Sequence, residues 1–279
     1  MDIELSGRLG ALSHPQRMRV FRLLMRRCPD AVPAGEIARV LNLKPSTTSV
    51  YLSALMQAGL ISQERRGTSL RYQVDLAAAR AVISDLFLGC CNGRADLCPP
   101  LPTPLADPTA QTLDRRMNVL FVCTGNSARS LFAEAILRHD AGARFNAYSA
   151  GAHPCEAVHP LTLEILREQR IDPSLLRPKP LSAYRGPDAP RFDFIFTVCN
   201  LAANEECAPW EAPAISAHWG LPDPAAAPGS DRRKKPAFQK VFDALRNRIE
   251  RFAALPFATA SPSTLQKHAD DIGKTPETT

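Results

Sequence analysis

The chain has 279 residues, enough for one large domain or two ordinary ones, and its 45% hydrophobic content is typical of a globular protein. It contains no run of about 18 apolar residues, and its N-terminus lacks a basic segment followed by an apolar one. We therefore expect a cytoplasmic protein with no membrane partner. In that reducing compartment, the eight cysteines indicate ligands, nucleophiles or buried thiols rather than disulfides.

The net charge of +6 is concentrated at the front of the chain. Residues 1–100 carry 13 Lys and Arg against 8 Asp and Glu, whereas the remainder is nearly balanced, with 21 against 20. A basic excess of this kind favours a polyanionic partner for the N-terminal part.

A proline-rich segment divides the chain. Five prolines fall between Pro99 and Pro108, a composition typical of an extended connector. We expect a first domain at residues 1–98, a linker at 99–116 and a second domain at 117–256. The tail, residues 257–279, is polar and is expected to be disordered.

The first domain is predicted to be mainly helical. Apolar spacing indicates helices over residues 15–26, 34–43 and 46–60, and the alternation around Arg66-Gly67 indicates a hairpin. A helix, a tight turn and a second helix is the geometry that places the second helix in a DNA major groove. The alternative is a helical domain with a solvated basic surface. The predicted DNA-contacting residues are small polar side chains of the second helix and arginines of the hairpin, namely Ser46, Thr47, Thr48, Ser49, Tyr51, Arg65, Arg66 and Arg71.

Residues 7–98, and above all "GEIARVLNLKPSTTSVYLSALMQAGL", resemble the ArsR/SmtB family of winged-helix repressors. The resemblance implies a homodimer, formed through this domain, that holds operator DNA until a toxic metal or metalloid ion binds. Many members carry a Cys-x-Cys pair at the start of the helix that precedes the recognition helix, where this chain reads "DAVPAGEIA". The usual metal site on that helix is therefore absent.

A different thiol cluster follows in "FLGCCNGRADLCPP", where Cys90, Cys91 and Cys98 lie within nine residues. Trivalent arsenic and antimony favour three thiolates in a pyramid, whereas zinc takes a fourth ligand. We therefore predict a site at which arsenite, or antimonite, acts as inducer. The alternative is a set of incidental cysteines at a domain end. Cys28 and Cys155 are isolated and are interpreted as structural.

Strand and helix patterns alternate through residues 117–256, which predicts an α/β domain with a parallel sheet and an active site at the carboxyl ends of its strands. Within "VLFVCTGNSARSLFAEAIL", a buried strand ends at Cys123, and Arg129 follows where a helix begins. Backbone N–H groups, the helix N-terminus and the arginine favour a tetrahedral oxyanion and are expected to lower the pKa of Cys123. The predicted oxyanion-binding loop comprises Thr124, Gly125, Asn126, Ser127, Ala128 and Ser130.

This loop, with "SAGAHP" and "HWGLPDPA", resembles the low-molecular-weight tyrosine phosphatase family over most of residues 117–256. The resemblance implies the fold of that family and a general acid at Asp223. The same fold serves both phosphatases and arsenate reductases, so other residues must distinguish the two. Ala225 and Ala226 stand where phosphatases usually carry aromatic residues. Cys199 and Cys207, in "FTVCNLAANEECAPW", resemble the redox segment of thioredoxin-coupled arsenate reductases.

We therefore predict a bifunctional protein, an arsenite-responsive repressor fused to an arsenate reductase. Cys123 attacks arsenate, and Cys199 then attacks the Cys123 sulfur to form a disulfide. Cys207 attacks Cys199 and passes the disulfide to a pair that thioredoxin can reduce; glutaredoxin with glutathione is the alternative reductant. We expect no tightly bound cofactor, although related enzymes imply a monovalent cation near Asn126, Glu134 and Ser149. The alternatives are a protein-tyrosine phosphatase with a DNA-binding regulatory domain and a repressor whose enzyme domain has decayed.

Overall fold

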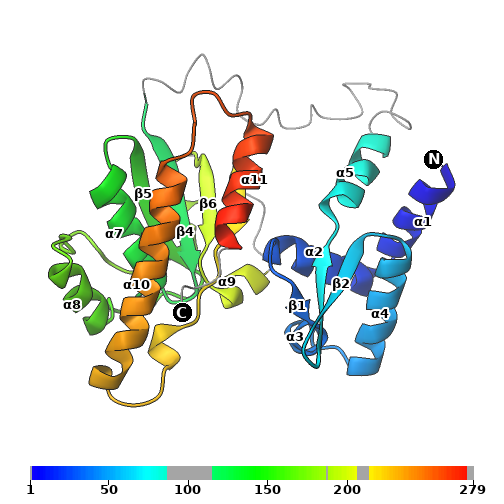
Figure 1. Cartoon of the computed structure of the whole chain (residues 1–279), viewed down its shortest axis with the longest axis horizontal. Coiled ribbons are helices and arrows are strands. Elements are labelled where there is room, and N and C mark those ends of the chain that lie inside the picture. The colour runs from blue at the N-terminus through cyan, green and yellow to red at the C-terminus, as the bar shows by residue number, and fades with distance from the viewer. Residues whose placement is uncertain (1, 87–114, 187, 206–213, 275–279) are drawn as a thin grey trace. The chain divides into compact units, whose positions relative to one another are not determined.

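The computed structural model describes residues 2–86, 115–186, 188–205 and 214–274 (Figure 1). The chain divides into two compact units, Met1–Thr103 and Pro104–Thr279. Among the helices in these ranges, none is both long enough and apolar enough to cross a membrane.

The first unit is a small helical domain with a three-stranded antiparallel sheet in the order β1-β3-β2. Its elements are α1 (Asp2–Leu12), α2 (Pro15–Arg27), β1 (Val32–Pro33), α3 (Ala34–Leu41), α4 (Pro45–Gln57), β2 (Ile61–Arg66), β3 (Ser69–Val74) and α5 (Leu76–Asp85).

Local sequence signals explain the boundaries of these elements. Pro15 begins α2, where its missing N–H costs nothing, and the His14 side chain accepts a hydrogen bond from the Gln16 amide. Gly59 follows α4 with a φ of 68°, a left-handed conformation that ends the helix at little cost. Leu24 and Leu52 are completely buried in the shared core. The predicted helix-turn-helix with its hairpin is therefore confirmed.

The second unit is built around a four-stranded, wholly parallel sheet in the order β5-β4-β6-β7. Its strands are β4 (Met117–Cys123), β5 (Phe145–Gly151), β6 (Phe194–Thr197) and β7 (Ile215–His218). Its helices are α7 (Arg129–Ala141), α8 (Pro160–Glu168), α9 (Asn200–Asn204), α10 (Asp231–Ala253) and α11 (Pro262–Gly273), with short 3-10 helices η2 (Leu181–Tyr184) and η3 (Pro224–Ala226).

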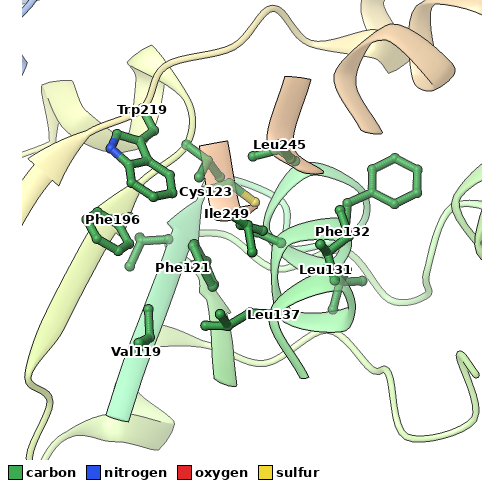
Figure 2. Close-up of a cluster of buried hydrophobic side chains, with 14 of the residues drawn as sticks. Val119, Phe121, Cys123, Leu131, Phe132, Leu137, Phe196, Trp219, Leu245 and Ile249 are labelled. Atoms are coloured by element: carbon green, nitrogen blue, oxygen red, sulfur yellow. The ribbon is translucent and has the colours of Figure 1, made fainter. Parts of the chain in front are cut away.

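The core of this unit is rich in aromatic side chains that lie between the sheet and its helices. Figure 2 shows Phe121, Phe196 and Trp219 together in this cluster, with Cys123 at the end of the β4 ribbon. The Phe196 and Trp219 rings stack with centroids 4.0 Å apart, and Phe252 of α10 meets Phe196 edge-on at 5.2 Å. A rigid core of this kind holds the carboxyl end of β4 in place.

The C-terminal segment is a correction to the sequence analysis, which predicted disorder over residues 257–279. Residues 262–273 form α11, because Leu265, Ala269 and Ile272 share one face and are buried. Gln266 anchors this helix to the sheet edge: its amide donates to the Ser216 carbonyl at 2.7 Å and accepts from the Ser216 N–H at 3.3 Å. Three apolar residues in a polar stretch are a weak periodic signal, so the prediction missed a helix whose order comes from tertiary contacts.

Candidate functional site

The parallel sheet brings two of the predicted catalytic cysteines to the same edge. Cys123 is the last residue of β4, and Cys199 follows the end of the adjacent strand β6, with Val122 paired to Thr197. The Thr124 hydroxyl lies 3.4 Å from the Cys199 sulfur, so this thiol contacts the loop that follows Cys123. Both thiols are almost fully buried.

The loop between β4 and α7 presents its amide N–H groups to one side. Its carbonyls are held on the other side by the segment after β5, and in a trans peptide the following N–H points the opposite way. This arrangement leaves N–H groups facing the Cys123 thiol, where an oxyanion would sit. The carbonyls of Cys123, Thr124, Gly125 and Ser127 accept from the amides of Ala152, His153, Cys155 and His159 at 3.1, 2.9, 2.8 and 3.1 Å.

Two contacts orient the Cys123 sulfur. The Asn126 N–H donates to it at 3.1 Å, and the Ser130 hydroxyl lies 2.8 Å from it. Asn126 adopts a left-handed φ of 44°, which turns its amide toward the sulfur. Gly151 allows the loop to approach β5, because a Cβ at that position would lie 2.6 Å from the Thr124 carbonyl oxygen.

The protonation state of Cys123 differs from the expectation. Burial raises the pKa of the Cys123 thiol above its ordinary value, and Cys199 adds to the rise. The Ser130 hydrogen bonds and the Arg129 charge oppose it but are outweighed. The prediction of a lowered pKa was therefore wrong for the free protein, because loss of hydration of the charged sulfur exceeds the favourable field of the loop.

Arg129 and Asp223 face each other across the mouth of the loop. The Arg129 guanidinium is buried, donating to the Leu221 carbonyl at 3.1 Å and pairing with the Asp223 carboxylate at 3.2 Å. The Asp223 side chain is 43% exposed, so one end of the pair meets solvent. Asp223 thus lies beside the loop with Cys123, as a proton donor must.

A buried histidine ties the Cys199 segment to the sheet, a contact that the sequence analysis missed. His218 of β7 lies 3.0 Å from the Asn200 side-chain oxygen and 2.8 Å from the Thr197 hydroxyl. Gly220 makes this possible, because a Cβ there would lie 2.5 Å from both the Asn200 oxygen and the His218 ring. Asn200 is the first residue of α9, so the contact fixes the helix that follows Cys199.

Four of the predicted site residues, Cys90, Cys91, Cys98 and Cys207, lie outside the described residues, as does most of the predicted linker. Within the described ranges, no group of three or more His, Cys, Asp and Glu is arranged to hold a metal ion. Cys155, interpreted as structural, is an exposed free thiol next to Gly125.

On the first unit, α4 presents a small polar face to solvent. Ser46 and Ser49 are exposed as predicted, but Thr48 is only 1% exposed and its hydroxyl donates to the Lys44 carbonyl. The assignment of Thr48 to DNA contact was therefore wrong, because it lies on the core face of the helix. Val50, which is 66% exposed, and Ser53 lie on the same face of the helix as Ser46 and Ser49. Their spacing of three and four residues in the sequence could have identified them as members of this face.

The other predicted DNA contacts differ in how freely they can reach out. Arg65 and Arg66 of β2 are exposed, and Arg66 pairs with Glu64 at 2.7 Å. Thr47 is half-buried. Arg71 is half-buried and turns back to the Ala31 carbonyl at 3.4 Å, and the half-buried Tyr51 ring contacts His14 with centroids 4.9 Å apart.

Comparison with known proteins gives a family model that matches each unit. Residues 118–268 match the family model described as low molecular weight phosphotyrosine protein phosphatase, and residues 12–64 match a helix-turn-helix domain model. An arsenate reductase of Bacillus licheniformis is 36% identical over 140 residues, which is 50% of this chain and 96% of that protein.

Two solved structures are also similar to parts of the chain. An arsenate reductase from Archaeoglobus fulgidus is 27% identical with a TM-score of 0.39, and the match covers 49% of this chain and 99% of that one. A homodimeric winged helix-turn-helix domain from Mycobacterium bovis, described as a possible ArsR-family regulator, is 25% identical with a TM-score of 0.26, over 29% of this chain and 72% of that one. On the evidence of the family models and the sequence relatives, the chain belongs to the low molecular weight phosphotyrosine protein phosphatase family and carries a helix-turn-helix domain ahead of its phosphatase-like unit.

Proposed function

We propose that the second unit is an arsenate reductase. The observation that carries this proposal is the contact between Cys199 and the loop after Cys123, through the Thr124 hydroxyl at 3.4 Å. A phosphatase needs one nucleophile, whereas a reductase needs a second thiol that can reach the first. The relatedness to the arsenate reductase of Bacillus licheniformis supports the same activity.

Arsenate binds in the loop with its oxygens on the backbone N–H groups and on Arg129. Because burial favours the neutral Cys123 thiol, its proton passes to an arsenate oxygen as the sulfur attacks arsenic. Asp223 takes up a proton from solvent and donates it to the departing oxygen, which leaves as water. The product is a covalent thiol–arsenate adduct on Cys123.

Reduction follows when Cys199, after losing its proton to solvent, attacks the Cys123 sulfur. The sulfur–arsenic bond breaks, its electron pair stays on arsenic, and arsenite leaves while a Cys123–Cys199 disulfide forms. Two thiol sulfurs are thereby oxidised and arsenic is reduced by two electrons. Cys207 then attacks Cys199, and thioredoxin reduces the new disulfide; if Cys207 has no such role, glutaredoxin with glutathione is the reductant.

When thioredoxin and thioredoxin reductase are supplied, the purified protein is expected to cause arsenate-dependent oxidation of NADPH, because each turnover leaves one disulfide to reduce. Arsenite formed should equal NADPH consumed, which chromatography with arsenic detection measures. No turnover with thioredoxin, and none with glutaredoxin and glutathione, would contradict the reductase and favour a phosphatase or an inactive enzyme unit.

We further propose that the first unit binds operator DNA as a homodimer and is released when arsenite binds Cys90, Cys91 and Cys98. The exposed polar face of α4, the exposed arginines of β2 and the helix-turn-helix family match support DNA binding. The chemistry of three thiolates supports arsenite as the inducer, and it links the two units because the second would produce the ion that the first detects.

Arsenite is expected to release the protein from a labelled duplex taken from upstream of its own gene, as measured by fluorescence anisotropy. The combined Cys90→Ser, Cys91→Ser and Cys98→Ser variant should keep its DNA affinity but lose at least about tenfold of the arsenite response, because hydroxyls are poor ligands for a soft ion. Equal release of the variant and the unmodified protein would contradict the thiol site.

A further inference from the structure

A buried carboxylate on α7, Glu134, is held by two cationic side chains. Glu134 is only 5% exposed, and its Oε2 accepts from the Lys179 ammonium at 2.9 Å and from the Ser149 hydroxyl at 2.5 Å. Its Oε1 accepts from the Arg138 guanidinium at 3.2 Å. The Lys179 side chain is 16% exposed, so this ion pair is largely shielded from solvent.

A continuous chain of hydrogen bonds joins this carboxylate to the Cys123 sulfur. The Ser149 hydroxyl donates to Glu134 and accepts from the Asn126 side-chain amide at 2.8 Å. The same amide donates its second hydrogen to the Ser130 hydroxyl at 2.8 Å. Ser130 therefore accepts from Asn126 and has its own proton free to donate to the Cys123 sulfur at 2.8 Å. When the Ser130 hydroxyl donates to the sulfur, this hydrogen bond favours a negatively charged sulfur.

Lys179 contacts this network at two separate points. Its backbone N–H donates to the Asn126 side-chain oxygen at 2.7 Å, which completes the hydrogen bonding of that amide. Its ammonium pairs with Glu134 at the far end of the chain. A side-chain substitution therefore removes the charge and leaves the backbone contact that holds Asn126.

The monovalent cation implied by related enzymes does not fit these residues. An alkali ion needs several oxygen lone pairs directed at it, and each of the three expected ligands already accepts at least one hydrogen bond. The Asn126 oxygen faces the Lys179 N–H, Ser149 accepts from Asn126, and Glu134 is shared between Lys179 and Arg138. A third positive charge at this position would meet the ammonium of Lys179 at close range.

A phenol close to this network, that of Tyr184, adds no charge near neutral pH. Burial, followed by the charge of Glu134, raises the pKa of Tyr184 to about 12, so this phenol stays neutral. Tyr148 acts on Tyr184 in the same direction and Arg177 opposes it. Cys199 raises the pKa of Cys123 itself, and the charge of Arg129 lowers it.

We propose that the Lys179 ammonium takes the place of a bound monovalent cation and is a positioning residue that, through Glu134, Ser149, Asn126 and Ser130, favours the thiolate of Cys123. The role in arsenate reduction rests on the proposed function, whereas the effect on the thiol does not. If this proposal holds, the protein works without an added alkali cation.

The test compares the unmodified protein with Lys179→Met, which removes the charge at similar volume, and with Lys179→Arg, which keeps it. Lys235→Met is a matched control, because Lys235 also pairs with glutamates, Glu164 and Glu168, but on the surface and away from the loop. Two readouts are used. One is the pH profile of Cys123 alkylation by iodoacetamide, quantified by peptide mass spectrometry, and the other is arsenate-dependent NADPH oxidation in potassium or tetramethylammonium chloride at equal ionic strength.

The unmodified protein is expected to turn over within about twofold in the two salts. Lys179→Met should shift the alkylation profile to higher pH by about one unit, which lowers the alkylation rate at neutral pH by about tenfold. Lys179→Arg and Lys235→Met should match the unmodified protein. The proposal would be overturned if potassium raised the turnover of the unmodified protein by more than about threefold. It would also be overturned if the alkylation profile of Lys179→Met coincided with that of the unmodified protein. The alkylation measurement needs no arsenate turnover. It therefore tests the role of Lys179 even if the protein proves not to reduce arsenate. If Lys179→Met does not fold, the salt comparison decides alone.

Discussion

Replacing Cys123 by serine is expected to lower arsenate-dependent NADPH oxidation by at least about 10³-fold. A serine hydroxyl holds its proton far more tightly than a thiol, and its oxygen could not form the disulfide that carries electrons away from arsenic. The Ser130 and Asn126 contacts that orient the sulfur would still orient the oxygen. Turnover is measured by NADPH absorbance with thioredoxin and thioredoxin reductase in excess.

The matched control is Cys155→Ser, which removes an exposed free thiol outside the proposed relay. It should retain nearly all of the activity, because the contact of Cys155 with the loop is made by its backbone N–H to the Gly125 carbonyl. Cys123→Ser should keep the Tm and still bind arsenate or phosphate by calorimetry, since the loop amides and Arg129 remain. Substantial turnover of a folded Cys123→Ser protein would remove Cys123 from the mechanism.

Cys199→Ser is expected to abolish arsenate turnover, by about 10³-fold or more, and to spare hydrolysis of an aryl phosphate such as p-nitrophenyl phosphate. The second thiol is needed only to take the sulfur from arsenic, whereas phosphate ester hydrolysis needs Cys123, Arg129 and Asp223. Serine at position 199 can keep the contact with the Thr124 hydroxyl. Both reactions are measured on the same protein sample, so a folding defect would lower both together.

The outcomes separate the proposed activity from its alternatives. A Cys199→Ser protein that reduces arsenate at the unmodified rate with glutathione would contradict the Cys123–Cys199 disulfide. Efficient aryl phosphate hydrolysis by the unmodified protein, without arsenate reduction, would instead favour the tyrosine phosphatase. Ala225, which stands where phosphatases usually carry an aromatic residue, lies in η3 directly after Asp223 and Pro224.

Sequence patterns were sufficient for the parts of the site that depend on chain order. A buried strand ending at Cys123, a loop and a helix beginning at Arg129 can each be read locally, and parallel topology then places Cys199 at the same edge. Thr48 was misassigned because five neighbouring residues were taken together, although a helix turns about 100° per residue and buries some of them.

Other features depend on packing between distant segments. Nothing local marks Lys179 as the partner of Glu134, 45 residues earlier, or His218 as the partner of Asn200. The pKa of Cys123 follows from the balance between lost hydration and the local field, and only the packed structure contains that balance. Residue types and spacing identify candidates for chemistry, whereas their protonation depends on burial.

The pairing of Gln266 with Ser216 has a consequence for how the protein behaves in a crowded solution. β7 is at the edge of the sheet, where unpaired backbone groups can recruit a strand from another molecule. The Gln266 amide supplies the donor and the acceptor that such a strand would supply. The Ala269 carbonyl of the same helix accepts a hydrogen bond from the indole N–H of Trp219, and Trp219 lies just before the segment that leads to Asp223. The same C-terminal helix therefore covers part of the sheet edge and also contacts Trp219, in the segment that leads to Asp223.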